Sequence, residues 1–250
     1  MVTTLKIPIL TFHSLDNGSS PLSFPPSLFR RGMAQLHRAG FRTVTVARAA
    51  RLLRQDGDGA SPARLMAITF DDGCQSFHEH AFPVLRDLGF QATIFVITAP
   101  EGSISLSFMR GKPRMTWDQL GRLQESGMEI GAHTVTHPDL TRLDEAGIVA
   151  ELEGSRAAIA DGVGVPAASF AYPFGFYNDR TRTLAQACFD CACSADLAVA
   201  DSTSDLHALG RLEMHYFRNE ATFALLSSPR LGQYIAVRSA LRAVRRRPRG

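Results

Sequence analysis

The chain has few of the features that mark secreted, membrane-embedded or nucleic-acid-binding proteins. Its 250 residues include four cysteines, too few for a disulfide scaffold at this length. No apolar run approaches the length of a transmembrane helix. The first residues lack the basic start, apolar core and small-residue cleavage site of a signal peptide. A net charge of only +3 argues against a nucleic-acid partner. We therefore expect a cytoplasmic protein.

What the chain does contain fits one globular domain. Hydrophobic residues make up 45% of it, which is ample for a core. Short apolar segments of strand character alternate with longer segments of helical character, and this alternation is typical of a parallel sheet or barrel. We predict an α/β fold, a single-domain distorted (β/α) barrel of about seven parallel strands. Strands are expected at 7–12, 43–46, 65–70, 92–97, 128–132 and 168–172, with helices at 25–39, 47–54, 76–88, 116–126, 144–160 and 179–187.

Two acidic residues end the strand expected at 65–70. Asp71 and Asp72 follow one another, and adjacent residues leaving a strand point in different directions. One carboxylate can therefore bind a metal ion while the other faces the water bound to that ion. Gly73 permits the sharp turn that presents them. An ordinary Asp-Gly turn with two solvated acids would explain the same segment.

Two histidines follow the strand expected at 128–132. His133 and His137 are four residues apart, a spacing compatible with one helical turn or a tight loop. Two neutral imidazoles and one carboxylate are a familiar ligand set for a catalytic divalent metal. Two surface histidines in a polar loop would be the alternative. In a parallel barrel, however, both motifs lie at the carboxyl ends of strands. Together they predict a metal with a free base beside it, which can activate water.

These segments resemble the motifs of a known family. Residues 69–73 (TFDDG) and 133–137 (HTVTH) match the first two motifs of the polysaccharide deacetylases, carbohydrate esterase family 4, and residues 170–175 (FAYPFG) resemble the third. The N-terminal strand that ends in His13 resembles the relocated histidine motif of the poly-N-acetylglucosamine de-N-acetylase subgroup. The resemblance extends over about residues 9–218.

The resemblance implies a metal-dependent hydrolase that removes N-acetyl groups from an N-acetylhexosamine-containing polysaccharide, oligosaccharide or glycolipid. Asp71 would be the general base and His13 the acid that protonates the leaving amine, although His13 could also be a strand-end histidine without chemistry. One divalent ion, zinc by first choice and otherwise cobalt, nickel or iron, would be held by Asp72, His133 and His137. The substrate and the oxyanion would contact Tyr172, Pro173 and Phe174.

One position departs from the family pattern. Ala171 stands where many members carry an arginine that orients the base. Arg211 and Arg218 are the candidates for that role, and His215 is the next candidate for the acid. Two other functions compete with N-deacetylation: a related amidohydrolase or esterase that acts on a non-sugar acyl bond, and a non-catalytic carbohydrate-binding relative. The intact metal and base motifs argue against the latter.

The last twenty residues differ from the rest. We expect a catalytic domain over 1–230 and a basic tail over 231–250, in which residues 238–249 contain six arginines and no acid. Apolar side chains recur at helical spacing in this tail, so an amphipathic helix that contacts an anionic inner membrane face is one interpretation. A solvated end is the other.

Overall fold

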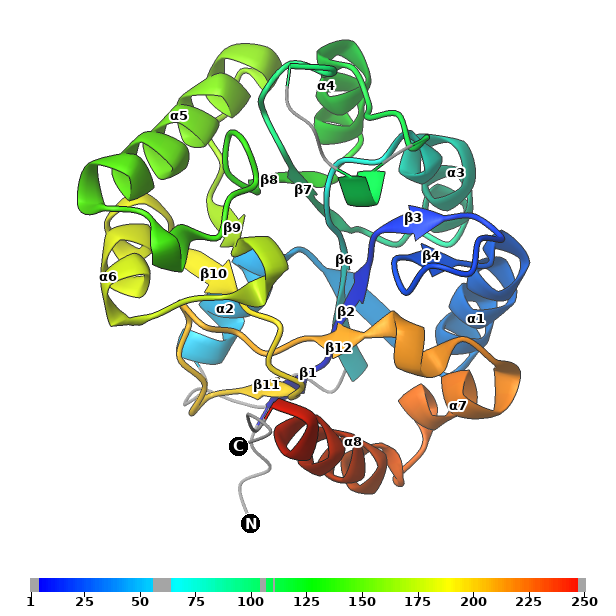
Figure 1. Ribbon diagram of the computed structural model, residues 1–250. Helices are drawn as coiled ribbons and strands as arrows, with labels where there is room; N and C mark the ends of the chain where they lie inside the picture. The colour runs from blue at the N-terminus through cyan, green and yellow to red at the C-terminus, as the bar shows by residue number, and fades with distance from the viewer. Residues whose placement is uncertain (1–4, 56–63, 104–106, 110, 247–250) are drawn as a thin grey trace.

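A curled parallel sheet forms the centre of the protein, and helices surround it (Figure 1). This computed structural model describes residues 5–55, 64–103, 107–109 and 111–246. Seven strands follow one another in the order β10-β9-β8-β7-β6-β2-β12, and β5 pairs with the start of β6. The predicted distorted barrel is confirmed. Its strands are β2 (Ile9–Phe12), β5 (Phe41–Val44), β6 (Arg64–Phe70), β7 (Thr93–Val96), β8 (Glu129–Ala132), β9 (Ser169–Ala171), β10 (Cys191–Cys193) and β12 (Leu212–Glu213).

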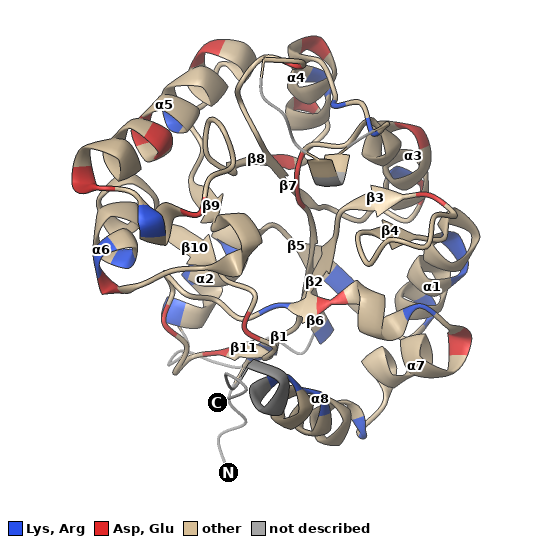
Figure 2. Cartoon of the chain, viewed as in Figure 1, with Lys and Arg blue, Asp and Glu red and all other residues tan. Residues whose placement is uncertain are grey.

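Six of the helices lie close to the predicted ranges, whereas the short helix Glu220–Ala224 was not predicted. Figure 2 shows most charged residues on these helices and on the loops around the sheet. One expected helix, at 76–88, is divided: a π-helical turn (Phe77–Ala81) precedes α3. Pro83 has no backbone N–H to continue regular bonding through the turn before it. The α-helices are α1 (Pro26–Arg38), α2 (Val46–Arg54), α3 (Phe82–Asp87), α4 (Trp117–Glu125), α5 (Glu145–Val163), α6 (Asp179–Cys188), α7 (Glu220–Ala224) and α8 (Leu231–Arg246).

Alternation along the strands separates the inside of the barrel from its outside. Successive strand residues face opposite sides. In β6, Ile68 belongs to the larger apolar cluster that includes residues of the surrounding helices, whereas Ala67 belongs to a smaller cluster with Phe95 and Ala171. The smaller cluster also includes residues of α2. The first two N–H groups of this helix donate to the side chains of Thr93 and Glu129, which are the first residues of β7 and β8. Because α2 covers the amino ends of these strands, an active site can form at their opposite, carboxyl ends.

The segment before β12 closes the barrel. The N–H of Leu209 donates to the carbonyl of Ala192 in β10, and the N–H of Ser194 donates back to Leu209. The chain then enters β12, which pairs in parallel with β2. Sequence patterns missed β10 and β12 because strands of three and two residues are too short to show a period.

The C-terminal segment is helical and contacts the barrel. Within α8, Ile235 is buried, the Tyr234 hydroxyl donates to the carbonyl of Tyr216, and Ser239 donates to Leu197. Val237 and Leu241 remain exposed. The domain boundary at residue 230 stays a prediction. In the described part of the chain, no helix combines the length and apolar character needed to cross a membrane.

Candidate active site

The three predicted ligand residues meet at the carboxyl ends of the strands. Asp72 follows β6, His133 follows β8, and His137 lies in the loop after it. One ligand atom from each lies within 4.8 Å of the others. The Nε2 atoms of His133 and His137 lie 3.6 and 3.7 Å from Oδ1 of Asp72. All three side chains are buried, and Asp72 and His137 have the positive φ angles that are uncommon outside glycine and concentrate at functional sites.

The carboxylate of Asp72 fits a bound cation. Both of its oxygens are buried without a hydrogen-bond partner among the residues described, although buried carboxylates are normally hydrogen-bonded. Burial raises the pKa of Asp72, so its charged form needs a compensating positive charge. Burial also lowers the pKa of His137 to about 3, which keeps its imidazole neutral and able to coordinate. An aspartate oxygen with two imidazole nitrogens suits a divalent transition metal.

Neighbouring groups fix the orientation of the histidines. Nδ1 of His133 lies 2.7 Å from the carbonyl of Ala171. When Nδ1 carries the proton it donates to this carbonyl, and Nε2 then presents its lone pair toward Asp72. The loop to His137 is held by Glu151, whose Oε2 accepts the N–H groups of Val135 and Thr136 at 2.7 and 2.9 Å. The sequence gives no local signal for Glu151, because it lies on α5, well beyond the motif.

A buried arginine holds Asp71. Arg211 donates from Nη1 and Nη2 to the two carboxylate oxygens, each at 2.8 Å, and its Nε donates to the carbonyl of Ser194. Burial is the largest single effect and would raise the pKa of Asp71, but the charge of Arg211, smaller contributions from His133 and His13, and the Arg211 hydrogen bonds together lower that pKa to about 2. Arg218 instead donates to the carbonyls of Ser20 and Gly18. Of the two arginines named from the sequence, only Arg211 therefore contacts Asp71.

The two candidate acids occupy different surroundings. Nε2 of His13 lies 4.0 Å from Oδ2 of Asp71, and the His13 side chain is 18% exposed. His13 also lines a cavity of about 260 Å³ together with Asp71, Asp72 and the two candidate ligand histidines. His215 lies in a short 3-10 helix with its ring 3.8 Å from that of Tyr216, and it is not part of the cavity lining. The geometry therefore places His13, rather than His215, beside the other titratable groups.

The third motif forms one wall of this cavity. Pro173 starts a 3-10 turn, and Phe174 has φ +57° and is 51% exposed. The Phe174 ring meets the His137 ring edge-on at 4.6 Å. Tyr172 also lines the cavity, but its hydroxyl donates to the carbonyl of His207. Gly175 has φ +70°, and a Cβ there would lie 2.5 Å from the backbone nitrogen of Ala195, so only glycine fits.

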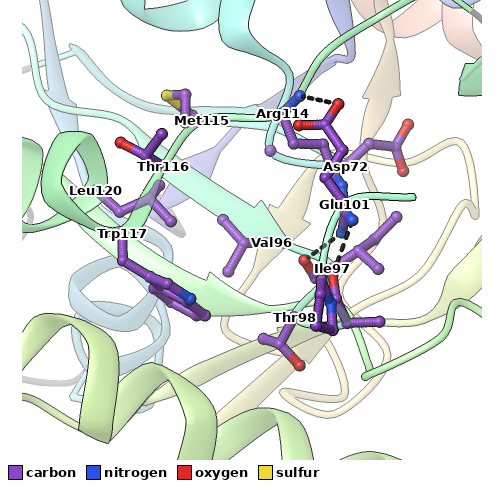
Figure 3. Close-up of a pocket in the computed structure, with 13 residues that line it drawn as sticks. Asp72, Val96, Ile97, Thr98, Glu101, Arg114, Met115, Thr116, Trp117 and Leu120 are labelled. Atoms are coloured by element: carbon purple, nitrogen blue, oxygen red, sulfur yellow. Dashed lines mark hydrogen bonds between the residues drawn. The ribbon is translucent and has the colours of Figure 1, made fainter. Parts of the chain in front are cut away.

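A larger cavity of about 340 Å³ adjoins the first at Asp72 (Figure 3). Its lining is largely apolar and includes Val96 and Trp117. Figure 3 shows Arg114 beside it, where the guanidinium donates to the carbonyls of Ile97 and Ala99. This cavity has neither a histidine nor Asp71 in its wall. The smaller cavity, which has both, is therefore the one equipped for chemistry.

Comparisons with known proteins agree with this assignment. The family model for polysaccharide deacetylase matches residues 58–188, more than half of the chain. YxkH of Bacillus subtilis, whose name places it among polysaccharide deacetylases, is 29% identical over 210 residues, which cover 84% of this chain and 71% of YxkH. The Streptococcus pyogenes deacetylase PplD, solved in complex with acetate, superposes with a TM-score of 0.74 at 27% identity and covers 84% of this chain and 92% of PplD. The poly-β-1,6-N-acetyl-D-glucosamine N-deacetylase of Staphylococcus aureus is 26% identical over 130 residues, 48% of this chain and 44% of that protein. The chain belongs to the polysaccharide deacetylase family of metal-dependent hydrolases.

Proposed function

We propose that this protein removes N-acetyl groups from an N-acetylhexosamine-containing polysaccharide, oligosaccharide or glycolipid. The observation that carries the proposal is the pairing of two carboxylates with opposite surroundings. Asp72 is buried with both oxygens unpartnered among the residues described and faces two imidazoles. Asp71, its neighbour, is ionised and held by Arg211. One acid is thereby suited to bind a cation and the other to accept a proton.

Asp72, His133 and His137 would hold one divalent ion, zinc by first choice, with cobalt, nickel or iron as alternatives. Such an ion, when bound, polarises the acetyl carbonyl and lowers the pKa of a water molecule. The chain contributes the orientation of its ligands: the Ala171 carbonyl fixes His133, and Glu151 fixes the loop that carries His137.

Asp71 would take the proton from the attacking water. Its low pKa keeps it ionised at neutral pH, and the bidentate contact with Arg211 fixes the plane of the carboxylate. A carboxylate of low pKa is a weak base, so proton transfer to it is efficient only from an acidified water. This requirement explains why the proposed base lies directly beside the proposed ligand set.

His13 would protonate the leaving nitrogen, and the backbone N–H of Phe174 would donate to the oxyanion that forms when water attacks the carbonyl. Both residues line the same cavity as Asp71, and they follow two different strands, β2 and β9. The S. aureus relative is named for a poly-N-acetylglucosamine substrate, and this name supports an N-acetylhexosamine as the substrate here.

The proposal is tested by metal reconstitution and acetate release. Protein stripped with a chelator is loaded with zinc, cobalt, nickel or iron, and acetate release is measured from oligomers of N-acetylglucosamine and from O-acetylated glycans. We expect amide cleavage that depends on the added metal. His133→Ala should lose both metal and activity, whereas His80→Ala, at an exposed position away from the cavity, should keep both. Cleavage of the esters alone would favour an esterase, and retained activity in His133→Ala would contradict the site.

A further inference from the structure

A third carboxylate, that of Glu213, lines the catalytic cavity beside Asp71 and Asp72. Arg211 and Glu213 are two residues apart, and Leu212 between them is buried in the outer apolar cluster. Since strand residues alternate in direction, Glu213 lies on the same side as Arg211, which reaches into the barrel to Asp71. Glu213 lines the cavity together with His13, Asp71 and Arg211.

Glu213 has no direct polar partner in the described part of the protein, although its charge interacts at longer range with that of Arg211. Its carboxylate has no capping hydrogen bond to the turn that follows it, and no other hydrogen bond or ion pair to it is found among the described residues. The nearby guanidinium of Arg211 is already paired with Asp71 through two short hydrogen bonds. Glu213 is only partly exposed, so its charge is incompletely screened by water. The cavity therefore contains a carboxylate that has no hydrogen bond or ion pair of its own among the described residues.

The position of this charge is defined by strand pairing. β12 pairs in parallel with β2, and Glu213 is in register with Thr11. His13 follows two residues after Thr11, on the same face of its strand. Glu213 thus lies on the strand next to β2, and His13 directly follows β2. If His13 is the acid, as in the proposed function, the leaving atom of the substrate lies near both side chains.

We propose that Glu213 makes this site selective for amides over esters. This inference rests on the proposed function. In amide hydrolysis, His13 gives its proton to the nitrogen of the tetrahedral adduct, and that nitrogen becomes positively charged. The C–N bond then breaks, its electron pair stays on nitrogen, the carbonyl re-forms as acetic acid, and the amine leaves. In ester hydrolysis the same proton neutralises a departing alkoxide, so no positive charge develops on the leaving atom.

A fixed negative charge beside the leaving atom therefore stabilises only the amide pathway. The charge is partly exposed, so its effect is that of one screened ion pair, and we expect about a tenfold effect on rate. Once released, the amine takes up a proton at neutral pH, and Glu213 should also bind this cationic product. Both consequences depend on charge rather than on the size of the side chain.

The test compares matched substrates in three variants. Glu213→Gln keeps the size and removes the charge, Glu213→Asp keeps the charge, and Glu125→Gln removes a charge from an exposed position at the end of α4, outside the cavity. Each is assayed on an N-acetylglucosamine oligomer and on an O-acetylated glucose oligomer of the same length. For Glu213→Gln we expect kcat/KM to fall about tenfold on the amide and less than twofold on the ester. Glu213→Asp should keep most of the selectivity, and Glu125→Gln should behave as the wild type.

Product binding gives a second measurement that does not need amide turnover. A glucosamine oligomer should inhibit ester hydrolysis by the wild-type enzyme, and its inhibition constant should rise about tenfold in Glu213→Gln. Equal losses on amide and ester would indicate a general positioning role and overturn the proposal, as would an unchanged amide rate or an unchanged inhibition constant. A rise in KM for both oligomers at constant kcat would mean recognition of hydroxyl groups and would also overturn it. Failure of the proposed function looks different: the metal-loaded wild type would not cleave the amide at all.

Discussion

Replacing Arg211 by methionine should make the stability of the metal-free protein depend on pH in a new way. Asp71 is 3% exposed, and its pKa is lowered from the ordinary value of 3.8 to about 2, because the charge and hydrogen bonds of Arg211, with smaller contributions from His133 and His13, together outweigh the effect of burial. A carboxyl group whose pKa is lower in the folded state stabilises that state above its unfolded pKa. This contribution is about 2 kcal/mol, and it is lost as the pH falls from about 4 to 2.

The substitution reverses the sign of this contribution. Without the guanidinium, burial would raise the pKa of Asp71 above its unfolded value. Keeping Asp71 ionised in the folded state then costs free energy that grows as the pH rises through the new pKa. We therefore expect Arg211→Met to lose about 2–4 kcal/mol of unfolding free energy at pH 7. At this pH the buried Asp71 carboxyl group must either stay charged without its partner or take up a proton, and both cost free energy. The loss should be clearly smaller near pH 4.5.

Urea unfolding in the presence of a chelator, followed by circular dichroism at several pH values, measures this difference. Arg218→Met is the matched control, because Arg218 donates to backbone carbonyls and not to a carboxylate, so any loss it causes should not change with pH. If the loss in Arg211→Met is independent of pH, or if it parallels the control, then the ion pair does not set the ionisation of Asp71 and the reasoning fails. In metal-loaded enzyme, the acidic limb of the pH–rate profile should also move to higher pH in Arg211→Met.

Three further predictions concern the cavity and its wall. Asp71→Asn should abolish turnover while metal analysis shows the ion retained, and loss of the metal would make Asp71 a ligand instead. His13→Ala should slow amide hydrolysis ~10²–10⁴-fold, with a much smaller effect on an activated aryl acetate and no change in metal content; an unchanged amide rate would move the acid elsewhere. A chain ending before Arg238 loses the hydrogen bonds from Ser239 and Arg242 to the carbonyls of Leu197 and Ala195, so we expect a higher KM for glycan, together with loss of any salt-sensitive binding to anionic vesicles. An unchanged KM would show that α8 does not support the cavity wall.

The proposed base and two of the three candidate ligand residues could be located from sequence because each lies at the end of a strand, and the third candidate, His137, lies in the loop that follows His133. Asp71 and Asp72 directly follow the buried residues of β6, and His133 directly follows β8. In a parallel barrel the ends of neighbouring strands meet at one face, so a one-dimensional pattern was enough to bring these residues together. The same argument placed His13 there, because it follows β2.

The partner of the base could not be chosen in the same way. Arg211 and Arg218 are equally basic and close in sequence, and the contact with Asp71 joins residues 140 positions apart. The choice depends on the segment that closes the barrel between β10 and β12, whose strands are too short to show a pattern. Arg211 lies in that segment just before β12, whereas Arg218 lies after the 3-10 helix that follows β12.

Position 171 lacks the arginine of the third motif, and the arginine at position 211 contacts Asp71 instead. The two features together amount to a change in the place from which an arginine reaches Asp71. Ala171 has a small side chain in the inner apolar cluster, and its carbonyl accepts from His133. A long side chain there would have to share the barrel interior with the guanidinium of Arg211, which lies 5.7 Å from the Phe95 ring. Since a packed interior has no room for two such groups, arginine at position 211 and alanine at position 171 fit together. The same change puts Glu213 at the cavity, because a strand that turns Arg211 inward must turn the residue two positions later inward as well. The position of the base-holding arginine and the charge beside the leaving group are therefore linked by the geometry of one strand.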